Sequence, residues 1–185
     1  LQHGTEPDPL LFGVDLYLID YSYPIEALKK LKEAGTKITL IDHHATNEPL
    51  VPLANESLFD LNHSGAVLSW NYFHDTAPVP KLLQHIQDFD LWKFDLPNTR
   101  EIDHALSLQE NTFENWSKLA EDFETDAGSA PHIQEGKTLL KNVERGVKRL
   151  IKHAEKITLD GHEVLMVTSP VFINELGHEL TRIHP

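Results

Sequence analysis

The sequence predicts an α/β fold in which a parallel sheet is flanked by helices, followed by a long connecting helix and the start of a second, smaller α/β domain. Two apolar runs, residues 13–19 and 37–41, each end on an aspartate, Asp20 and Asp42. Between them, apolar residues recur at helical spacing, and Gly35 then marks a helix end. A strand, a helix and a second strand joined in this way run parallel, so both strands end at the same edge of the sheet.

The rest of the chain is assigned from periodicity and turn residues. Residues 51–61 are predicted to be an irregular connection, and a helix is expected to begin after an N-cap at Asn62 or Ser64. Helical patterns cover 82–89, 113–124, 132–156 and 171–183, with a break at 126–131 and a hairpin around Asp160-Gly161. We therefore expect a first domain at 1–125, a linker helix at 126–157 and the beginning of a second domain at 158–185.

Composition limits the classes of function. The formal charge of -13, from 16 basic and 29 acidic residues, argues against extended binding of nucleic acid, which depends on Lys and Arg. The chain contains no cysteine, which excludes disulfides and thiolate metal sites. No apolar run reaches the roughly 20 residues of a membrane span, and no secretory signal opens the chain. These features predict a soluble, cytoplasmic protein without membrane contacts, and they allow a homodimer.

The triplet Asp42-His43-His44 is the strongest indication of chemistry. It ends an apolar strand, where open α/β sheets place their ligands, and carboxylate with imidazole suits Mn²⁺, Zn²⁺ or Fe²⁺ better than Ca²⁺. A single Asp-His pair at a strand end is more often an ordinary polar loop start. Asp20 stands at the equivalent place on the preceding strand, and this favours a metal site.

Two further segments contribute candidates. Asp88 and Asp90 follow an apolar helical face, and either carboxylate could complete a metal shell, although solvated acids at a helix end are the simpler interpretation. His63 and Ser64 precede a helix whose free N-H groups would favour a phosphate oxygen if the turn faces the site. A capped helix packed into the core is an equally good interpretation of Ser64.

Taken together, these motifs resemble the DHH superfamily of phosphoesterases. The resemblance covers about residues 10–100 and is closest to the branch described as exopolyphosphatase-related or oligoribonuclease-like. Its motifs are the strand ending in Asp20 with Ser22 and Pro24, the Asp42 triplet, Ser64-Gly65-Ala66 with Trp70 and Phe73, and the run from Asp88 to Trp92.

The resemblance implies a ligand set. Asp20 matches an aspartate that bridges two divalent cations, usually Mn²⁺, with Mg²⁺ or Co²⁺ as other choices. His43 matches a direct metal ligand. Asp88 is taken as the fourth-motif ligand, and Asp90 is kept as its rival because the Asp-x-Asp arrangement does not decide between them.

It also implies a reaction. His44 matches a residue that contacts the phosphate or supports the metal shell, and Asp42 matches a carboxylate that holds the imidazoles or the metal-bound water from outside the shell. The expected activity is hydrolysis of a phosphoester or phosphoanhydride in a small phosphorylated substrate, such as polyphosphate, a short oligonucleotide or a nucleotide, by a water that two metals activate.

The sequence departs from the superfamily at both ends. No strand ending in an Asp-x-Asp turn precedes Gly13, and no glycine-rich, histidine-containing loop occurs before Pro185. The chain also begins with Leu1 rather than Met. We therefore expect an internal portion of a longer protein, and the alternative function is a catalytically incomplete module that binds metal or phosphate.

Overall fold

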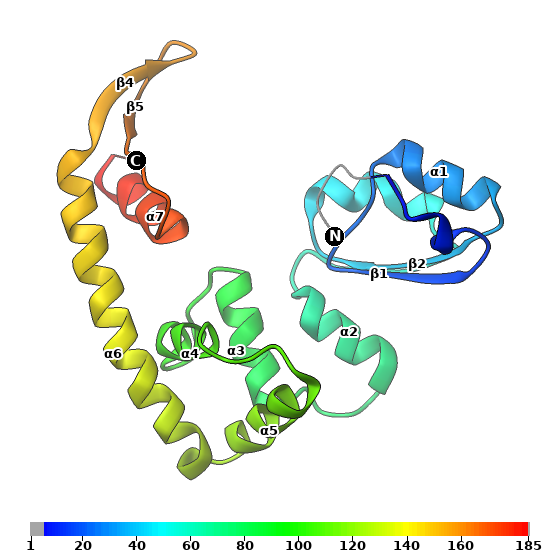
Figure 1. Cartoon of the computed structure of the whole chain (residues 1–185), viewed down its shortest axis with the longest axis horizontal. Helices are drawn as coiled ribbons and strands as arrows, with labels where there is room; N and C mark the ends of the chain where they lie inside the picture. The colour runs from blue at the N-terminus through cyan, green and yellow to red at the C-terminus, as the bar shows by residue number, and fades with distance from the viewer. Residues whose placement is uncertain (1–5, 185) are drawn as a thin grey trace. The chain divides into compact units, whose positions relative to one another are not determined.

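The computed structural model describes residues 6–184, which divide into two compact units (Figure 1). Of the described residues, 6–99 and 111–128 form the first unit, and 100–110 and 129–184 form the second. A parallel sheet with helices forms the first unit, which confirms the α/β class. The expected domain limits at 125 and 157 stay a prediction, since residues 100–110 group with the second unit and helix α6 contributes to both.

Three parallel strands form the sheet in the order β1-β2-β3, namely β1 (Asp15–Ile19), β2 (Lys37–Asp42) and β3 (Glu56–Phe59). The prediction of an irregular connection at 51–61 was wrong, because a 3-10 segment (Ala45–Leu53) is followed by β3. Asn55, which directly precedes this strand, is bonded to β2. Its N-H donates to Ile38 O at 2.7 Å, and its side-chain oxygen accepts the Ile38 N-H at 2.9 Å. A strand of four residues is too short to show a clear alternation of apolar and polar residues in the sequence.

Helices cover both faces of this sheet (Figure 1). Helix α1 (Ile25–Glu33) packs Leu28 and Leu31 against the β1 and β2 side chains that share its face. The buried strand residues of this cluster are Leu18, Ile38 and Leu40. Helix α2 (Gly65–His74) lies on the opposite face, and Ser64 is its N-cap, as one of the two expected choices. Because side chains alternate between the two faces of a strand, successive side chains of β2 point toward α1 and toward α2 in turn.

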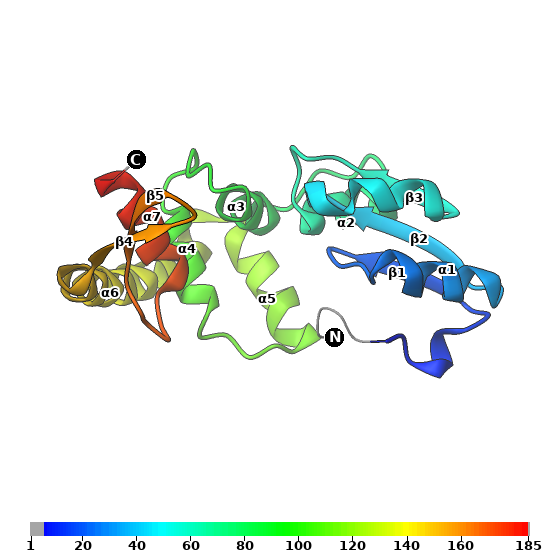
Figure 2. The same ribbon diagram turned by 90° about the horizontal axis from the view of Figure 1, so that it is seen from above.

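Helices α3 (Lys81–Asp90) and α5 (Phe113–Phe123) complete the first unit. Helix α3 packs on α2 and on α5. In Figure 2, α3 is seen nearly end-on and α5 extends away from it. The backbone N-H of Lys81 donates to Glu124 Oε1 at 3.0 Å, and the Lys81 ammonium donates to Glu124 O at 2.9 Å. These two bonds tie the beginning of α3 to the end of α5.

The second unit contains most of α4 (Thr99–Leu106) and α6 (Asp126–Leu150), the hairpin of β4 (Glu155–Leu159) and β5 (His162–Met166), and α7 (Ile173–Ile183). The expected break at 126–131 was wrong, because α6 begins at Asp126 and carries Pro131 in its second turn, where only one backbone hydrogen bond is lost. The hairpin prediction is confirmed. Asp160 and Gly161 both have positive φ, 51° and 84°, as a two-residue hairpin turn requires.

Candidate metal centre

The carboxyl ends of the three parallel strands carry the candidate residues. Asp20 directly follows β1, Asp42 is the last residue of β2, and Asp60 directly follows β3. The ladder continues through them, because Asp20 N donates to Ile41 O at 2.9 Å and Asp60 N donates to Asp42 O at 3.3 Å. All three carboxyl groups therefore lie at the carboxyl ends of the strands, where the strand-helix-strand pattern predicted Asp20 and Asp42.

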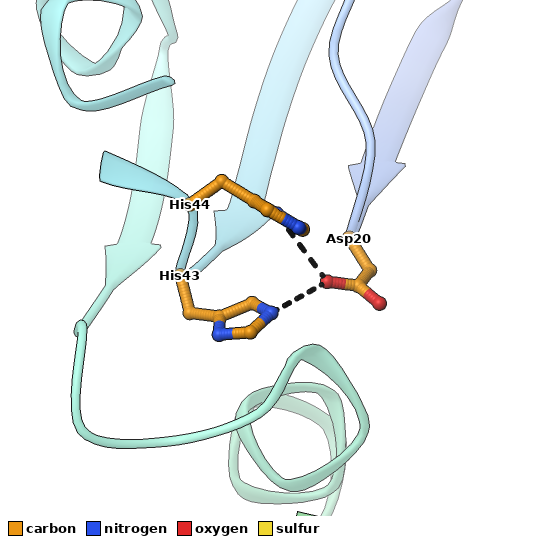
Figure 3. Close-up of side chains that lie close together, drawn as sticks. All are labelled: Asp20, His43 and His44. Carbon is orange, nitrogen blue, oxygen red and sulfur yellow. Dashed lines mark ion pairs between the residues drawn. The ribbon is translucent and has the colours of Figure 1, made fainter. Parts of the chain in front are cut away.

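Asp20, His43 and His44 come together at this edge (Figure 3). Asp20 Oδ1 lies 3.1 Å from His43 Nε2 and 3.7 Å from His44 Nδ1. One potential ligand atom from each residue lies within 4.8 Å of the other two. Two ligand atoms that both bind one ion at about 2.1 Å are separated by at most about 4.2 Å. Asp20 thus lies within shared-ligand distance of both imidazoles.

His43 provides the best test of whether a cation fits here. Its side chain is 10% exposed, and its buried Nε2 makes no hydrogen bond within residues 6–184. This nitrogen lies between two carboxylates, 3.1 Å from Asp20 Oδ1 and 3.3 Å from Asp90 Oδ2. A buried ring nitrogen that makes no hydrogen bond is costly unless another group satisfies it. A divalent cation held by the imidazole and the two carboxylates would do so, and the residues present fit such an ion.

Asp42 holds both histidines in place through hydrogen bonds to its carboxylate. Its fully buried carboxylate accepts hydrogen bonds from the backbone N-H groups of His43 and His44, at 2.7 and 2.9 Å, and from Asn47 Nδ2 at 2.7 Å. His44 Nδ1 lies 2.8 Å from the same carboxylate. Burial opposes ionisation of Asp42, but these hydrogen bonds outweigh it and lower the pKa of the carboxyl group.

The contact between Asp42 and His44 Nδ1 determines the pKa and the tautomer of the His44 imidazole. The hydrogen bond to Asp42 raises the pKa of the His44 imidazole, and the charges of Asp20 and Asp90 act in the same direction against the opposing effect of burial. With Nδ1 donating to Asp42, the lone pair of the neutral ring is on Nε2. His44 is half exposed at the sheet edge, where this nitrogen can serve a ligand or a substrate.

Asp88 and Asp90 lie in different surroundings. Asp90 Oδ2 lies beside His43, whereas the Asp88 carboxylate is 5% exposed and binds the turn that follows α3. It accepts hydrogen bonds from Asp95 N at 2.8 Å, Leu96 N at 3.0 Å and Thr99 Oγ1 at 2.6 Å. The two carboxylates leave the helix about 200° apart, so only one can face the sheet edge. Asp90 is therefore the candidate ligand, and Asp88 shapes the turn.

Gly65, the first residue of α2, lies directly against Asp20. A Cβ at position 65 would be 2.4 Å from Asp20 Cγ, so only glycine allows the helix to begin this close to the carboxylate. Asp20 itself has φ of 54°, a left-handed conformation that aspartate adopts more readily than most residues. The beginning of α2 and the candidate metal ligand are thus packed together.

His63 and Ser64 have defined roles next to this contact. Ser64 is buried, and its Oγ accepts the Val67 N-H at 3.3 Å, so its hydroxyl serves as the helix cap rather than as a free phosphate ligand. His63 Nδ1 lies 2.8 Å from Asp60 Oδ2. Within residues 6–184, the N-H groups of Gly65 and Ala66 make no hydrogen bond. These backbone groups, rather than the serine hydroxyl, are the donors that remain for an anion at this helix start.

Three residues that shape the site were not predicted from the sequence. Asn47 donates to Asp42, Asp60 pairs with His63, and Gln87 Oε1 accepts the Ser64 N-H at 3.1 Å. Asp60 could have been found if β3 had been recognised, because it follows a strand as Asp20 does. Asn47 and Gln87 carry no signal in the sequence, since their contacts depend on how distant segments fold together.

The sequence is similar to that of a viral protein. The chain is 29% identical over 173 residues to the uncharacterized protein R106 of Acanthamoeba polyphaga mimivirus. This match covers 90% of the chain but 40% of the relative, so the chain spans well under half of that protein's length. No protein-family model and no solved structure matches the chain.

The helices were also compared with the requirements for a membrane span. Within residues 6–184, none of the helices combines the length and the apolar character needed to span a membrane.

Proposed function

We propose that this chain carries the metal centre of a phosphoesterase of the DHH type, which hydrolyses a phosphoester or phosphoanhydride in a small phosphorylated substrate. The observation that carries the proposal is the buried His43 Nε2, which lies without a hydrogen bond between the carboxylates of Asp20 and Asp90. The order of Asp20, the Asp42 triplet, Gly65 and Asp90 along the chain supports it through the resemblance described above.

Asp20, His43 and Asp90 would hold a divalent metal, with Mn²⁺ the best match to two carboxylates and an imidazole and Mg²⁺ or Co²⁺ as other choices. His44, whose Nδ1 is hydrogen-bonded to Asp42, would contact the substrate through Nε2. A bound divalent metal supplies Lewis acidity, which lowers the pKa of a coordinated water and neutralises charge on a phosphoryl group. The remaining steps depend on residues of the chain itself.

Asp42 is a positioning residue in this scheme. By accepting hydrogen bonds from both backbone N-H groups of the histidine pair and from His44 Nδ1, it fixes the direction of the imidazole that faces the substrate. The first N-H groups of α2 would bind a phosphate oxygen, assisted by the positive end of the helix dipole. His63, oriented by Asp60, would add a donor near the same oxygen atoms.

A module that binds metal or phosphate without hydrolysis is the second candidate. It is favoured by the ligand count, because residues 6–184 contain one group of three or more potential ligand side chains, at Asp20, His43 and His44. With Asp90 these residues suffice for one ion. Two-metal hydrolysis requires further ligands, so metal stoichiometry and hydrolysis must be measured separately.

Thermal unfolding with and without Mn²⁺ tests the metal centre. A ligand at about 100 times its Kd stabilises a folded protein by about 2.7 kcal/mol, so Mn²⁺ should raise the Tm of the wild type and fail to do so in His43→Ala. His162→Ala, on the exposed strand β5, is the matched control and should respond like the wild type. Equal stabilisation of His43→Ala and wild type would refute the proposed ligand set.

A hydrolysis assay separates the two candidate functions. The wild type should release phosphate or nucleotide from polyphosphate, a short oligonucleotide or a nucleotide in the presence of Mn²⁺, and both His43→Ala and His44→Ala should lose this activity. Mn²⁺ binding without turnover of any of these substrates would support the binding module instead.

A further inference from the structure

Three aromatic side chains, which we call the aromatic cluster, gather on the face of the sheet that α2 covers: Tyr17 of β1 with Tyr72 and Phe73 of the last turn of α2. The ring centroids are 6.2 Å apart for Tyr17 and Tyr72, 5.6 Å for Tyr17 and Phe73, and 5.0 Å for Tyr72 and Phe73. Tyr72 is about 10 Å further along α2 than Gly65, which contacts Asp20. The cluster is therefore separate from the candidate metal centre.

The aromatic cluster is exposed at the surface of the first unit. The exposed fraction is 48% for Tyr17 and 53% for Phe73, and Tyr72 is partly exposed. Apolar side chains that are exposed singly are normal, but exposed ones that contact each other mark sites of interaction. Aromatic residues are also enriched where proteins bind partners. The cluster thus offers aromatic surface to a ligand or a partner.

A carboxylate lies beside the rings. The Tyr72 hydroxyl donates a hydrogen bond to Glu56 Oε2 at 2.8 Å, and this bond raises the pKa of Tyr72, so that the hydroxyl keeps its proton. Tyr17, Thr39 and Glu56 are register partners in β1, β2 and β3, so they form one row across the sheet. Glu56 is exposed and makes no ion pair within residues 6–184. Its charge is available to a cation.

The wider surroundings of the cluster are also acidic. Asp15 lies two residues before Tyr17 on the same face of β1, with Lys37 at 3.9 Å and with a side chain that is 74% exposed. Asp75 follows the cluster at the C-cap of α2. The first unit as a whole contains 19 acidic and 7 basic residues. Exposed rings among carboxylates attract cations and disfavour nucleic acid, whose binding depends on Lys and Arg.

The packing of the rings indicates the shape of the cation. A round ammonium group binds best inside a cage of rings, but these three rings pack on one another with centroids 5.0 to 6.2 Å apart. A planar guanidinium needs no cage, because it stacks on the outer surface of a ring. It is also more weakly hydrated than an ammonium group and binds carboxylates through a fork of N-H donors. An arginine side chain fits this surface better than a lysine side chain.

We propose that the aromatic cluster binds an arginine side chain of a protein partner. The guanidinium stacks on the exposed rings of Tyr17 and Phe73, and the carboxylates of Glu56 and Asp15 balance its charge. Such a contact joins an aromatic anchor to an arginine, the two kinds of side chain that contribute most to binding at protein interfaces. It requires neither the metal centre nor hydrolysis, so it stands or falls independently of the proposed function.

A labelled acetyl-Gly-Arg-Arg-Gly-amide peptide is the probe, and fluorescence anisotropy at about 50 mM salt, where screening is weak, measures its binding to the 185-residue protein. The wild type should bind. The double variant Tyr17→Leu/Phe73→Leu keeps the net charge but loses both exposed rings, so it should bind at least about fivefold more weakly. Phe113→Leu, which removes an exposed ring from α5, is the matched control and should bind like the wild type. Equal binding by the double variant and the wild type would overturn the inference.

Two further comparisons test the charge and the shape of the ligand. Glu56→Gln should weaken binding of the arginine peptide, and an unchanged affinity would overturn the role of this carboxylate. A peptide with citrulline in place of arginine has the same shape without the charge and should not bind measurably. A lysine peptide should bind more weakly than the arginine peptide to the wild type, and equal affinity would overturn the assignment to a guanidinium.

Discussion

The Cα of Gly65 lies so close to the carboxyl group of Asp20 that an added Cβ would be 2.4 Å from Cγ and 2.5 Å from Oδ1. The start of a helix and the end of a strand are thereby in direct contact at the candidate metal centre. This contact explains why a glycine follows the N-cap Ser64, although glycine is a poor helix former.

Gly65→Ala should displace the Asp20 carboxylate. Because the added methyl group would overlap Asp20 Cβ, Cγ and Oδ1, this side chain must move, and we expect a loss of about 1–3 kcal/mol in the free energy of unfolding. The Tm increase caused by Mn²⁺ should also be reduced or lost. Gly177→Ala is the control, since a Cβ there meets nothing within 4 Å and should stabilise α7 by about 0.5–1 kcal/mol. An unchanged Mn²⁺ response in Gly65→Ala would contradict the role of this contact.

Asp90→Asn and Asp88→Asn should have opposite effects. Asp90→Asn removes a charge that faces Asp20 and His43, so it should weaken Mn²⁺ binding about tenfold or more without reducing the stability of the metal-free protein. Asp88→Asn should retain the metal ligands but lose about 1–3 kcal/mol of stability, because a neutral amide cannot accept all three hydrogen bonds of the carboxylate. Chemical denaturation and Mn²⁺ titration of both variants distinguish the two roles.

Asp88 should also contribute to acid unfolding. Burial opposes its ionisation, but hydrogen bonds from Thr99, Asp95 and Leu96 lower its pKa below the ordinary value of 3.8. A depressed carboxyl pKa gives stability that is complete above the unfolded-state value and is lost as the pH falls through the folded-state value. The stability of wild type should therefore fall more steeply than that of Asp88→Asn below about pH 4. Parallel curves from denaturation at several pH values would disagree with this assignment.

The imidazole of His44 should titrate above its ordinary value of 6.5 in the metal-free protein, because the hydrogen bond to Asp42 raises its pKa. Its contribution to stability is present below 6.5 and is lost as the pH rises through the higher folded-state value. In Asp42→Asn the His44 pKa should move down, since the carboxylate charge is absent. NMR titration of the histidine ring protons measures both values, and identical pKa values in the two proteins would rule out the proposed control by Asp42.

Gly136 provides a stability prediction in the second unit. A Cβ at this position of α6 would be 1.7 Å from Glu101 O in α4, so the two helix backbones approach too closely for any side chain. Gly136→Ala should therefore separate α4 from α6 and lower the free energy of unfolding by about 1–3 kcal/mol or more. Circular dichroism during denaturation measures the loss, with Gly177→Ala again as the control.

Much of the first unit could be predicted because its pattern is local. The apolar runs ending in Asp20 and Asp42, and the helical spacing between them, determine two parallel strands and a shared edge. Strand β3 could not be predicted, because its four residues lack a period and its place beside β2 depends on pairing with residues distant in the sequence, including the two bonds between Asn55 and Ile38.

The site could be predicted only in part for a related reason. Residues adjacent in sequence, such as His43 and His44, are bound to lie together, and Asp20 follows from the parallel sheet. The choice between Asp88 and Asp90 depends on the rotation of α3 about its axis, which packing against α2 and α5 determines. The carboxylate that the sequence analysis preferred is the one that packing turned toward Thr99.

Strand β2 is bonded on both sides, whereas β1 and β3 form the two edges of the described sheet. Amide hydrogens in the centre of a sheet exchange only when larger parts of the structure open, and those of edge strands exchange sooner. His43 and His44 follow the central strand, while Asp20 and Asp60 follow the edges. Thermal fluctuations of β1 should therefore separate the Asp20 carboxylate from His43 and His44 while the central strand still holds the two imidazoles in place.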